Sequence, residues 1–345
     1  MTQALTNLIL PYNSISIIGM CKNAGKTTVL NKLLTDCRKL GITMGITSIG
    51  RDGEEVDIVT GTDKPKIFVS KGTIIATAAG LLKKSDITIE ILRTTQINTP
   101  LGEIVFVRAR SDGYVQIGGS SIGSQIVSLL EDFKELGADK VLIDGAISRK
   151  TLGSPIISDA VILSTGASLG ADMNKVVRET AFVAKLLTLE PLQEEHVRKL
   201  IGGLDEHTQK FSAIMADNTV RPVDLENSAG IADGAAYIYV RGALSDGLLN
   251  KLIMSNVNLR GVKIVVDDGS KLFITERTYE KVRLKGSQII VLRPINLLAV
   301  TINPISTMGY IFDKDTFKAA LSEQLEVPVY NAADEKGALH NVFER

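Results

Sequence analysis

Cysteine, histidine and net charge are scarce in this sequence, and each scarcity excludes a class of protein. Only Cys21 and Cys37 are present, together with three histidines, so neither a disulfide framework nor a zinc site is indicated. Lys and Arg number 39, as do Asp and Glu, so no net field draws the chain to nucleic acid or anionic lipid. We therefore expect a cytoplasmic protein that binds neither nucleic acid nor a membrane.

Long apolar runs are also lacking. Residues 1–14 have neither the basic start nor the apolar stretch of a signal peptide. The longest uncharged run, residues 294–312, contains prolines, asparagines and a glycine, which argues against a membrane helix. Glycine is abundant, with 30 residues, and 44% of the chain is apolar. This composition is typical of an α/β protein with many tight strand-to-helix turns.

Apolar periodicity predicts strands that alternate with helices. A buried strand at residues 14–19 precedes an amphipathic helix at 26–40, whose apolar face contains Val29, Leu33, Leu34 and Leu40. A hairpin at 90–94 and 103–109 is expected at a sheet edge. The other expected elements are strands at 41–48, 140–144, 159–164, 235–240, 262–266, 288–291, 297–302 and 327–330, and helices at 123–136, 173–189, 245–255, 276–284 and 314–325.

The pattern becomes weak and polar at residues 191–230, where we expect a connecting segment. It separates a first domain, residues 1–190, from a C-terminal α/β region, residues 231–345. That region either extends the first sheet or forms a sheet of its own.

The segment between the first strand and the first helix has the features of a phosphate-binding loop. The pattern GxxxxGK[ST] would place glycine at position 20, where the sequence has Met20 after Gly19; the rest of the pattern is intact. Gly25 lets the backbone approach a phosphate, Lys26 brings a positive charge to the β and γ oxygens, and Thr27 offers a hydroxyl to Mg²⁺.

An ordinary helix start is the alternative, but the strand before the loop and the amphipathic helix after it favour nucleotide binding. Lys22 has two interpretations: a second lysine that reaches the nucleotide of a paired subunit, or a solvated surface residue. The predicted nucleotide-binding residues are Lys22, Asn23, Ala24, Gly25, Lys26, Thr27, Thr28 and Asn303.

A second acid is needed to hold Mg²⁺, usually at the carboxyl end of a neighbouring parallel strand. The segment KVLIDGA ends such a strand at Asp144. A strand-ending Asp is also a common turn former, but beside Lys26 and Thr27 it becomes the predicted metal acid. The predicted metal ligands are thus Thr27 and Asp144.

Acidic residues follow the second predicted strand in SIGRDGEEVD, where Asp52 is the first candidate to orient an attacking water or a substrate hydroxyl. A solvated acidic loop is the other interpretation. The predicted catalytic residues are therefore Lys26, Asp144 and Asp52.

Asn303 follows a predicted strand in TINP, where it either reads a nucleotide base or forms a turn. The sequence contains no Asn-Lys-x-Asp segment, which favours ATP over GTP. The expected ligands are ATP and Mg²⁺, with GTP less favoured.

The segments GMCKNAGKTT and VLIDGA resemble the phosphate-loop NTPases of the class that includes dethiobiotin synthetase, the molybdopterin-guanine dinucleotide adaptor protein and the metallochaperone GTPases of cobalamin mutases. The resemblance covers residues 14–165. It implies an α/β fold of three αβα layers around a mostly parallel sheet, and frequent homodimers.

The segments GMCKNAGKTTVLN, TSIGRDGE, NTPLGEI, DGYVQIGGSS and INPIS also resemble the reactivase subunits that accompany adenosylcobalamin-dependent lysine 5,6-aminomutase. That resemblance implies an ATP-fuelled chaperone that frees damaged cobalamin from a mutase, with the mutase or a companion reactivase subunit as partner. Two alternatives stay open: a small-molecule ligase or kinase of the dethiobiotin synthetase kind, and a nucleotide-binding structural protein without turnover.

Overall fold

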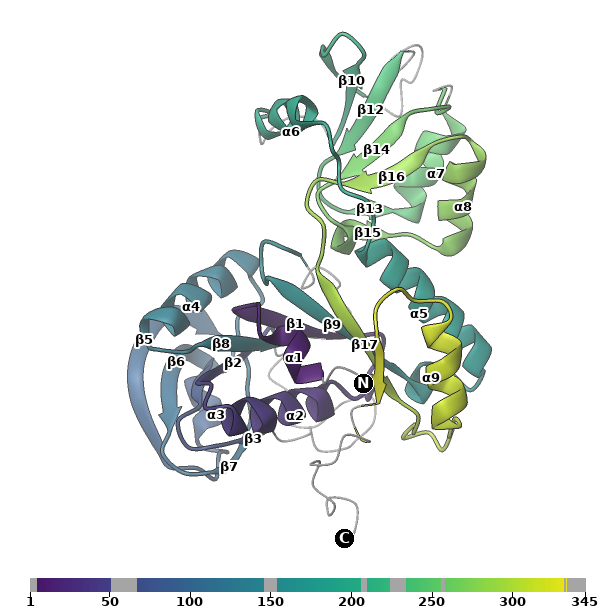
Figure 1. Ribbon diagram of the computed structural model, residues 1–345. Coiled ribbons are helices and arrows are strands. Elements are labelled where there is room, and N and C mark those ends of the chain that lie inside the picture. Colours follow the sequence, from purple (N-terminus) through teal and green to yellow (C-terminus); the bar gives the residue numbers. More distant parts are fainter. Residues whose placement is uncertain are drawn as a thin grey trace. The chain divides into compact units, whose positions relative to one another are not determined.

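The computed structural model describes residues 5–50, 67–145, 154–205, 210–223, 234–255, 258–331 and 333. The protein is α/β, with a large, mostly parallel sheet. The chain forms two compact units, coloured by sequence in Figure 1. Unit 1 comprises Met1–Ala181 and Asn296–Arg345, and unit 2 comprises Phe182–Ile295.

This division differs from the one expected from the sequence. The segment at 191–230, expected to connect two domains, contains helix α6 (Glu195–Gly202) and strands β10 (Phe211–Met215) and β11 (Val220–Pro222) of unit 2. The C-terminal region divides as well, because residues from 296 onward return to unit 1. The polar pattern at 191–230 has a simple cause: α6 is short and buries only Val197 and Ile201.

A nine-stranded sheet forms the centre of unit 1, in the order β18-β17-β9-β1-β8-β2-β4-β6-β5. Neighbouring strands are parallel except at β4–β6 and β6–β5, where the pairing is antiparallel. The expected hairpin thus lies at the edge of the sheet. The strands are β1 (Ser14–Gly19), β2 (Met44–Ser48), β4 (Ile74–Ala78), β5 (Ile89–Thr99), β6 (Gly102–Ala109), β8 (Lys140–Asp144), β9 (Ala160–Gly166), β17 (Leu297–Asn303) and β18 (Val329–Asn331).

Helices pack on both faces of this sheet. One face joins α1 (Leu5–Ile9), α2 (Lys26–Lys39) and the two-stranded sheet of β3 (Ile67–Val69) and β7 (Gly113–Val115) in one apolar cluster. The other face receives α4 (Gly123–Glu135), where Phe133 packs edge-to-face on Phe106 with ring centroids 4.9 Å apart. The remaining elements are α3 (Ala79–Leu82), η2 (Ala167–Leu169), α5 (Met173–Leu187) and α9 (Lys314–Ser322).

The apolar face predicted for α2 is confirmed in part. Val29, Leu33 and Leu34 are buried, whereas Leu40 is 57% exposed. Leu40 is the C-cap residue, one position beyond the last helical turn. The chain has therefore left the buried stripe of the helix when it reaches Leu40.

Unit 2 contains a five-stranded sheet in the order β11-β10-β12-β14-β16. The strands β12 (Ala235–Val240), β14 (Lys263–Val266) and β16 (Gln288–Val291) run parallel, while β10 and β11 are antiparallel additions. Helices α7 (Asp246–Met254) and α8 (Glu276–Leu284) pack with one apolar cluster and α6 with another. Short elements complete the unit: β13 (Leu244–Ser245), β15 (Leu272–Phe273) and η3 (Gly269–Lys271).

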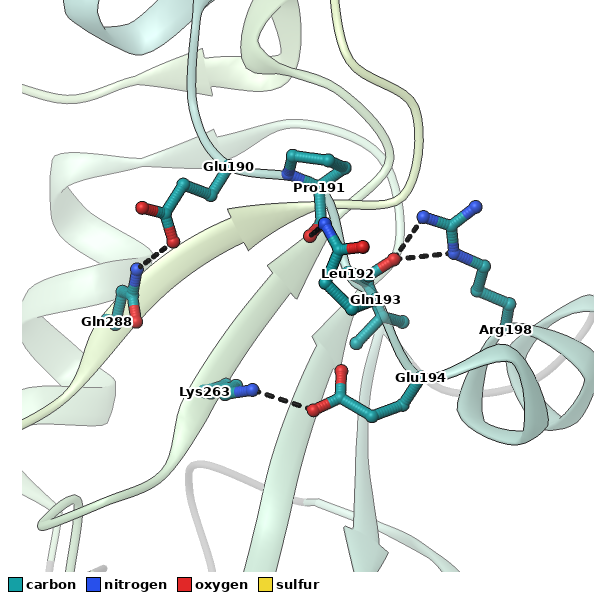
Figure 2. Close-up of polar contacts among 8 residues, drawn as sticks. All are labelled: Glu190, Pro191, Leu192, Gln193, Glu194, Arg198, Lys263 and Gln288. Atoms are coloured by element: carbon teal, nitrogen blue, oxygen red, sulfur yellow. Dashed lines mark hydrogen bonds and ion pairs between the residues drawn. The ribbon is translucent and has the colours of Figure 1, made fainter.

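The segment of residues 190–194 is bound to β16 and β14 by backbone and side-chain contacts, and Figure 2 shows its side-chain contacts with Gln288 and Lys263. Leu192 N donates to Val291 O at 2.7 Å, and Val291 N donates to Glu190 O at 3.0 Å. Lys263 Nζ donates to Glu194 Oε1 at 2.8 Å and holds the pKa of that carboxyl at about 2. These contacts explain why residues 190–194 belong to unit 2 and do not form a free linker.

Among the described residues, no helix combines the length and the apolar character needed to cross a lipid bilayer.

Candidate functional site

The loop that joins β1 to α2, residues 20–25 and called the phosphate loop below, has two residues in left-handed backbone conformations. Asn23 has φ 59° and Gly25 has φ 91°. Such angles are routine for glycine but uncommon for other residues. Met20 N donates to Ser164 O at 2.8 Å and anchors the loop start to β9. The loop is therefore a defined turn, followed at once by the N-terminus of α2.

Lys26 begins α2 and its side chain folds back over the phosphate loop. Its Nζ donates to Cys21 O at 3.3 Å. A Cβ built on Gly19 would lie 2.8 Å from this Nζ and 3.0 Å from Lys26 Cδ. A side chain at position 19 would thus occupy the space of the Lys26 side chain. This contact gives a physical reason for the glycine that stands one place before the expected position.

Asp144 ends β8, the strand between β1 and β2. It pairs in register with Ile17 of β1 and Ser48 of β2. The backbone on both sides of its side chain is fixed, because Gly145 N donates to Ile17 O and Ile49 N donates to Asp144 O. Its Oδ1 is buried and has no hydrogen-bond partner in the described part of the chain. A buried carboxylate oxygen without a partner is costly and calls for a ligand or a proton.

The charges of Asp144 and Lys26 act on each other. Burial raises the pKa of Asp144 to about 6, and the positive charge of Lys26 opposes this increase. Burial also lowers the pKa of Lys26, against the opposing effect of Asp144. The site therefore holds one cationic and one acidic group, each destabilised by loss of water. An anion bound beside Lys26 and a cation bound beside Asp144 would stabilise these two charges.

Asn303 lies at the carboxyl end of β17 and contacts the phosphate loop. Its Nδ2 donates to Asn23 O at 2.8 Å. Asn23 in turn donates from Nδ2 to Thr307 Oγ1 at 3.1 Å. Sequence reasoning singled out Asn303 for a base contact, and the structure gives it partners within the protein. The Thr307 contact was not predicted, because nothing in the sequence marks one threonine as the neighbour of Asn23, 284 positions away.

The other predicted residues are placed as follows. Ala24 is buried, Thr27 and Lys22 are half-buried, and Thr28 is exposed on the first turn of α2. Asp52 lies outside the described residues. The structure thus brings the phosphate loop, Lys26, Thr27 and Asn303 to the carboxyl ends of the parallel strands, where Asp144 also lies. This is the edge at which open α/β sheets bind ligands.

Metal binding by protein side chains alone is not indicated by the described part of the chain, which contains no group of three or more His, Cys, Asp or Glu side chains suited to one metal ion. Thr27 and Asp144 offer a hydroxyl and a carboxylate. Mg²⁺ commonly takes one or two protein oxygens and completes its shell with water and substrate phosphates. These two residues fit that mode of binding.

A separate hollow of about 350 Å³ lies in unit 2, lined by His196, Lys199, Leu200 and Asn218. None of the residues of the predicted nucleotide site belongs to it.

Comparison with models of protein families, with curated proteins and with solved structures finds no match for this chain. The functional assignment therefore depends on the residues and their geometry.

Proposed function

We propose that this protein binds ATP with Mg²⁺ through the phosphate loop and hydrolyses it. The main observation behind this proposal is the position of Lys26. Its side chain folds over the phosphate loop and donates to Cys21 O, and its charge interacts with the buried carboxyl of Asp144. An ordinary helix start requires neither a lysine held over its own loop nor a buried acid beside it.

Anion binding is supported by the backbone of the site. The N-cap residue of α2 is Gly25, which has no side chain to accept a hydrogen bond from the first amides of the helix. The first amide groups of a helix lack partners within the helix and point outward with the positive end of the helix dipole. A terminal phosphate would accept from these groups while Lys26 neutralises part of its charge.

Magnesium would be held by Thr27 and, directly or through water, by Asp144. A bound Mg²⁺ would supply charge neutralisation on the phosphate oxygens. The residues of this chain would orient the terminal phosphate and stabilise its negative charge through the loop amides and Lys26. Asp52 remains the candidate to orient the attacking water.

The fold of unit 1 agrees with this proposal. Its parallel strands, with helices on both faces, are compatible with the three αβα layers of phosphate-loop NTPases, which we propose for unit 1. Asp144 ends β8, the strand directly beside β1, an arrangement in which one bound nucleotide could reach both the loop and the metal acid.

We further propose that turnover drives a conformational change in a protein partner. The resemblance to the reactivase subunits of lysine 5,6-aminomutase supports a chaperone role of this kind. Nucleotide can drive such a cycle only if it favours one conformer and hydrolysis removes that preference. The direct test is ATP hydrolysis with and without a candidate mutase, because stimulation by the mutase separates this role from a nucleotide-binding structural one.

The substitution Lys26→Ala tests nucleotide binding. We expect it to weaken Mg²⁺-ATP binding by about 10- to 100-fold, the range for a lost hydrogen bond to a charged group. The fold should persist, because burial already lowers the pKa of Lys26 and disfavours its charge. Titration calorimetry measures the affinity and thermal unfolding measures the fold.

Lys39→Ala is the matched control, since Lys39 lies on the same helix and its side chain is 62% exposed. It should bind ATP like the unaltered protein. Equal ATP affinity in the Lys26→Ala and Lys39→Ala proteins would refute the proposed role of Lys26.

A further inference from the structure

Asn303, far from the phosphate loop in the sequence, makes a direct hydrogen bond to it. Its amide nitrogen donates to the carbonyl of Asn23 at 2.8 Å. Asn23 is the non-glycine residue of the loop with a left-handed backbone, at φ 59°. Such a conformation persists when surrounding contacts hold it. The hydrogen bond from Asn303 thus holds the residue of the loop whose backbone conformation is least favourable.

Packing around Asn303 is as close as its hydrogen bond. A Cβ built on Gly25 would lie 3.3 Å from Asn303 Cβ. A Cβ built on Gly166, at the end of β9, would lie 2.3 Å from Asn303 O. Asn303 therefore fits between the phosphate loop and the end of β9, with little room to move.

The hydrogen-bonding groups of the Asn303 amide are already engaged within the protein. Nδ2 donates to Asn23 O, and Oδ1 accepts from Ile305 N at 3.2 Å. An asparagine that reads a purine edge presents both its amide oxygen and its amide nitrogen to that base. Nδ2 keeps a second N–H and Oδ1 a second lone pair, but the two existing bonds fix the orientation of the amide and tie it to the phosphate loop and to Ile305.

We propose that Asn303 is a positioning residue for the phosphate loop and does not read the nucleotide base. Its amide holds Asn23 O and so fixes the loop amides that receive the phosphates, while Thr307 holds the Asn23 side chain. This inference rests on the proposed function. It requires that loss of the Asn303 amide weaken every ligand carrying a triphosphate equally, whatever base the ligand carries.

Asn303→Ala is the test variant, and the sequence offers a matched control in Asn296→Ala. Asn296 precedes the same strand, β17, and its Nδ2 also donates to a backbone carbonyl at 2.8 Å, that of Asp159. The probes are ATP, GTP and inorganic triphosphate, each with Mg²⁺, titrated by calorimetry. We expect Asn303→Ala to weaken all the probes that the unaltered protein binds by the same factor, about tenfold for one lost hydrogen bond, and Asn296→Ala to leave them unchanged.

Two further variants separate the contacts. Asn303→Asp keeps an oxygen that accepts from Ile305 N but replaces the donor to Asn23 O with a second acceptor, so it should weaken triphosphate binding at least as much as Asn303→Ala. Thr307→Val removes the hydroxyl that accepts from Asn23 Nδ2 and keeps the side-chain shape. It should weaken binding by a smaller, base-independent factor.

Hydrogen exchange in the ligand-free proteins gives a second measurement that does not depend on nucleotide binding. The amides of residues 21–25 should exchange faster in Asn303→Ala than in Asn296→Ala. Loss of ATP affinity with unchanged inorganic triphosphate affinity, or a changed ratio of ATP to GTP affinity, would identify a base reader and overturn the inference. Unchanged loop exchange would overturn it as well. If the unaltered protein binds no probe, the proposed function fails, and the exchange data alone decide the role of Asn303.

Discussion

Asp144 carries an electrostatic cost in the ligand-free protein. Burial raises its pKa from 3.8 to about 6, which corresponds to about 3 kcal/mol at 1.36 kcal/mol per pKa unit. Because the folded-state pKa exceeds the unfolded value, the cost is absent below about pH 4, develops between about pH 4 and 6, and is constant above that range. The residue that we propose to hold Mg²⁺ is thus one that weakens the fold at neutral pH.

Asp144→Asn should therefore stabilise the ligand-free protein at pH 7.5 by up to about 3 kcal/mol, since an amide carries no buried charge. The gain should shrink as the pH falls through 6 and disappear near pH 4. Urea denaturation at several pH values measures this difference. The same substitution should weaken Mg²⁺-dependent ATP hydrolysis, because the carboxylate proposed to hold the metal is lost.

Asp172→Asn is the control, because an asparagine oxygen can still accept the hydrogen bond that Lys175 N donates to Asp172. It should change neither stability nor hydrolysis. A pH-independent effect of Asp144→Asn on stability would contradict the account based on a buried charge.

Sequence reasoning locates residues at this scale only where chemistry and local pattern coincide. The sequence singled out Lys26 and Asp144 as candidates because Lys26 belongs to a short motif after an apolar strand and Asp144 ends such a strand. The contact of Asn303 with Asn23 was not, because it joins residues 280 positions apart and nothing in the local sequence specifies which end-of-strand asparagine meets the loop. The role of Asp52 remains a prediction, since it lies outside the described residues.

Among the elements, α2 links the candidate site to the core of unit 1. Its first residue is Lys26, and its buried face contributes to the apolar cluster shared with β1, β2 and β8. A helix so anchored keeps its N-terminus, and hence its amide groups, in a fixed position relative to the sheet.

Leu33→Ala should destabilise unit 1 by about 2–5 kcal/mol, because it empties space in a close-packed core. Leu33 is fully buried, whereas Leu40, just past the same helix, is 57% exposed. Leu40→Ala is thus the matched control and should cost less than about 0.5 kcal/mol. Denaturation midpoints in urea measure both. Similar losses of stability in the Leu33→Ala and Leu40→Ala proteins would contradict the finding that Leu33 is in the core and Leu40 is not.

Several elements with a clear apolar period were predictable from the sequence. The strands at 140–144, 235–240 and 288–291 and the helix at 276–284 are confirmed with the expected bounds. Residues 195–222 were missed because α6 and β11 leave most of their residues exposed, and because β10, although largely buried, has Ser212 and Ala213 in its middle and so lacks a clear apolar run. Residues 73–82 combine a strand with a short helix, so neither period extends far enough to be recognised.

At the scale of the molecule, the chain builds two units with separate cores. The apolar cluster around α2 and that around α7 and α8 share no residue. Units with separate cores are expected to unfold as separate cooperative units unless a large apolar interface couples them.

Leu249→Ala, in the core of unit 2, and Leu33→Ala, in the core of unit 1, test this independence. Both leucines are fully buried, so each change should cost about 2–5 kcal/mol in its own unit. Hydrogen exchange followed by mass spectrometry should show faster exchange in Phe182–Ile295 for the first variant and in unit 1 for the second. Equal acceleration in both units for either variant would show that they unfold together.

The sequence predicted alternating strands and helices in both halves of the chain. It did not specify which C-terminal strands join unit 1. Local periodicity identifies β17 as a strand, but its neighbours are decided by packing between distant segments. β17 pairs with β9, which precedes unit 2 in the chain. Of the two alternatives left open for the C-terminal region, extension of the first sheet holds for β17 and β18, whereas β12, β14 and β16 belong to a separate sheet.

The return of the chain has a consequence for biosynthesis. The phosphate loop is synthesised before unit 2, whereas Asn303 emerges only after all of unit 2 has been made. Under the proposed function, the nucleotide site of a nascent chain stays incomplete while unit 2 is being made. Full ATP affinity would thus be reached only in a polypeptide to which β17 has been added.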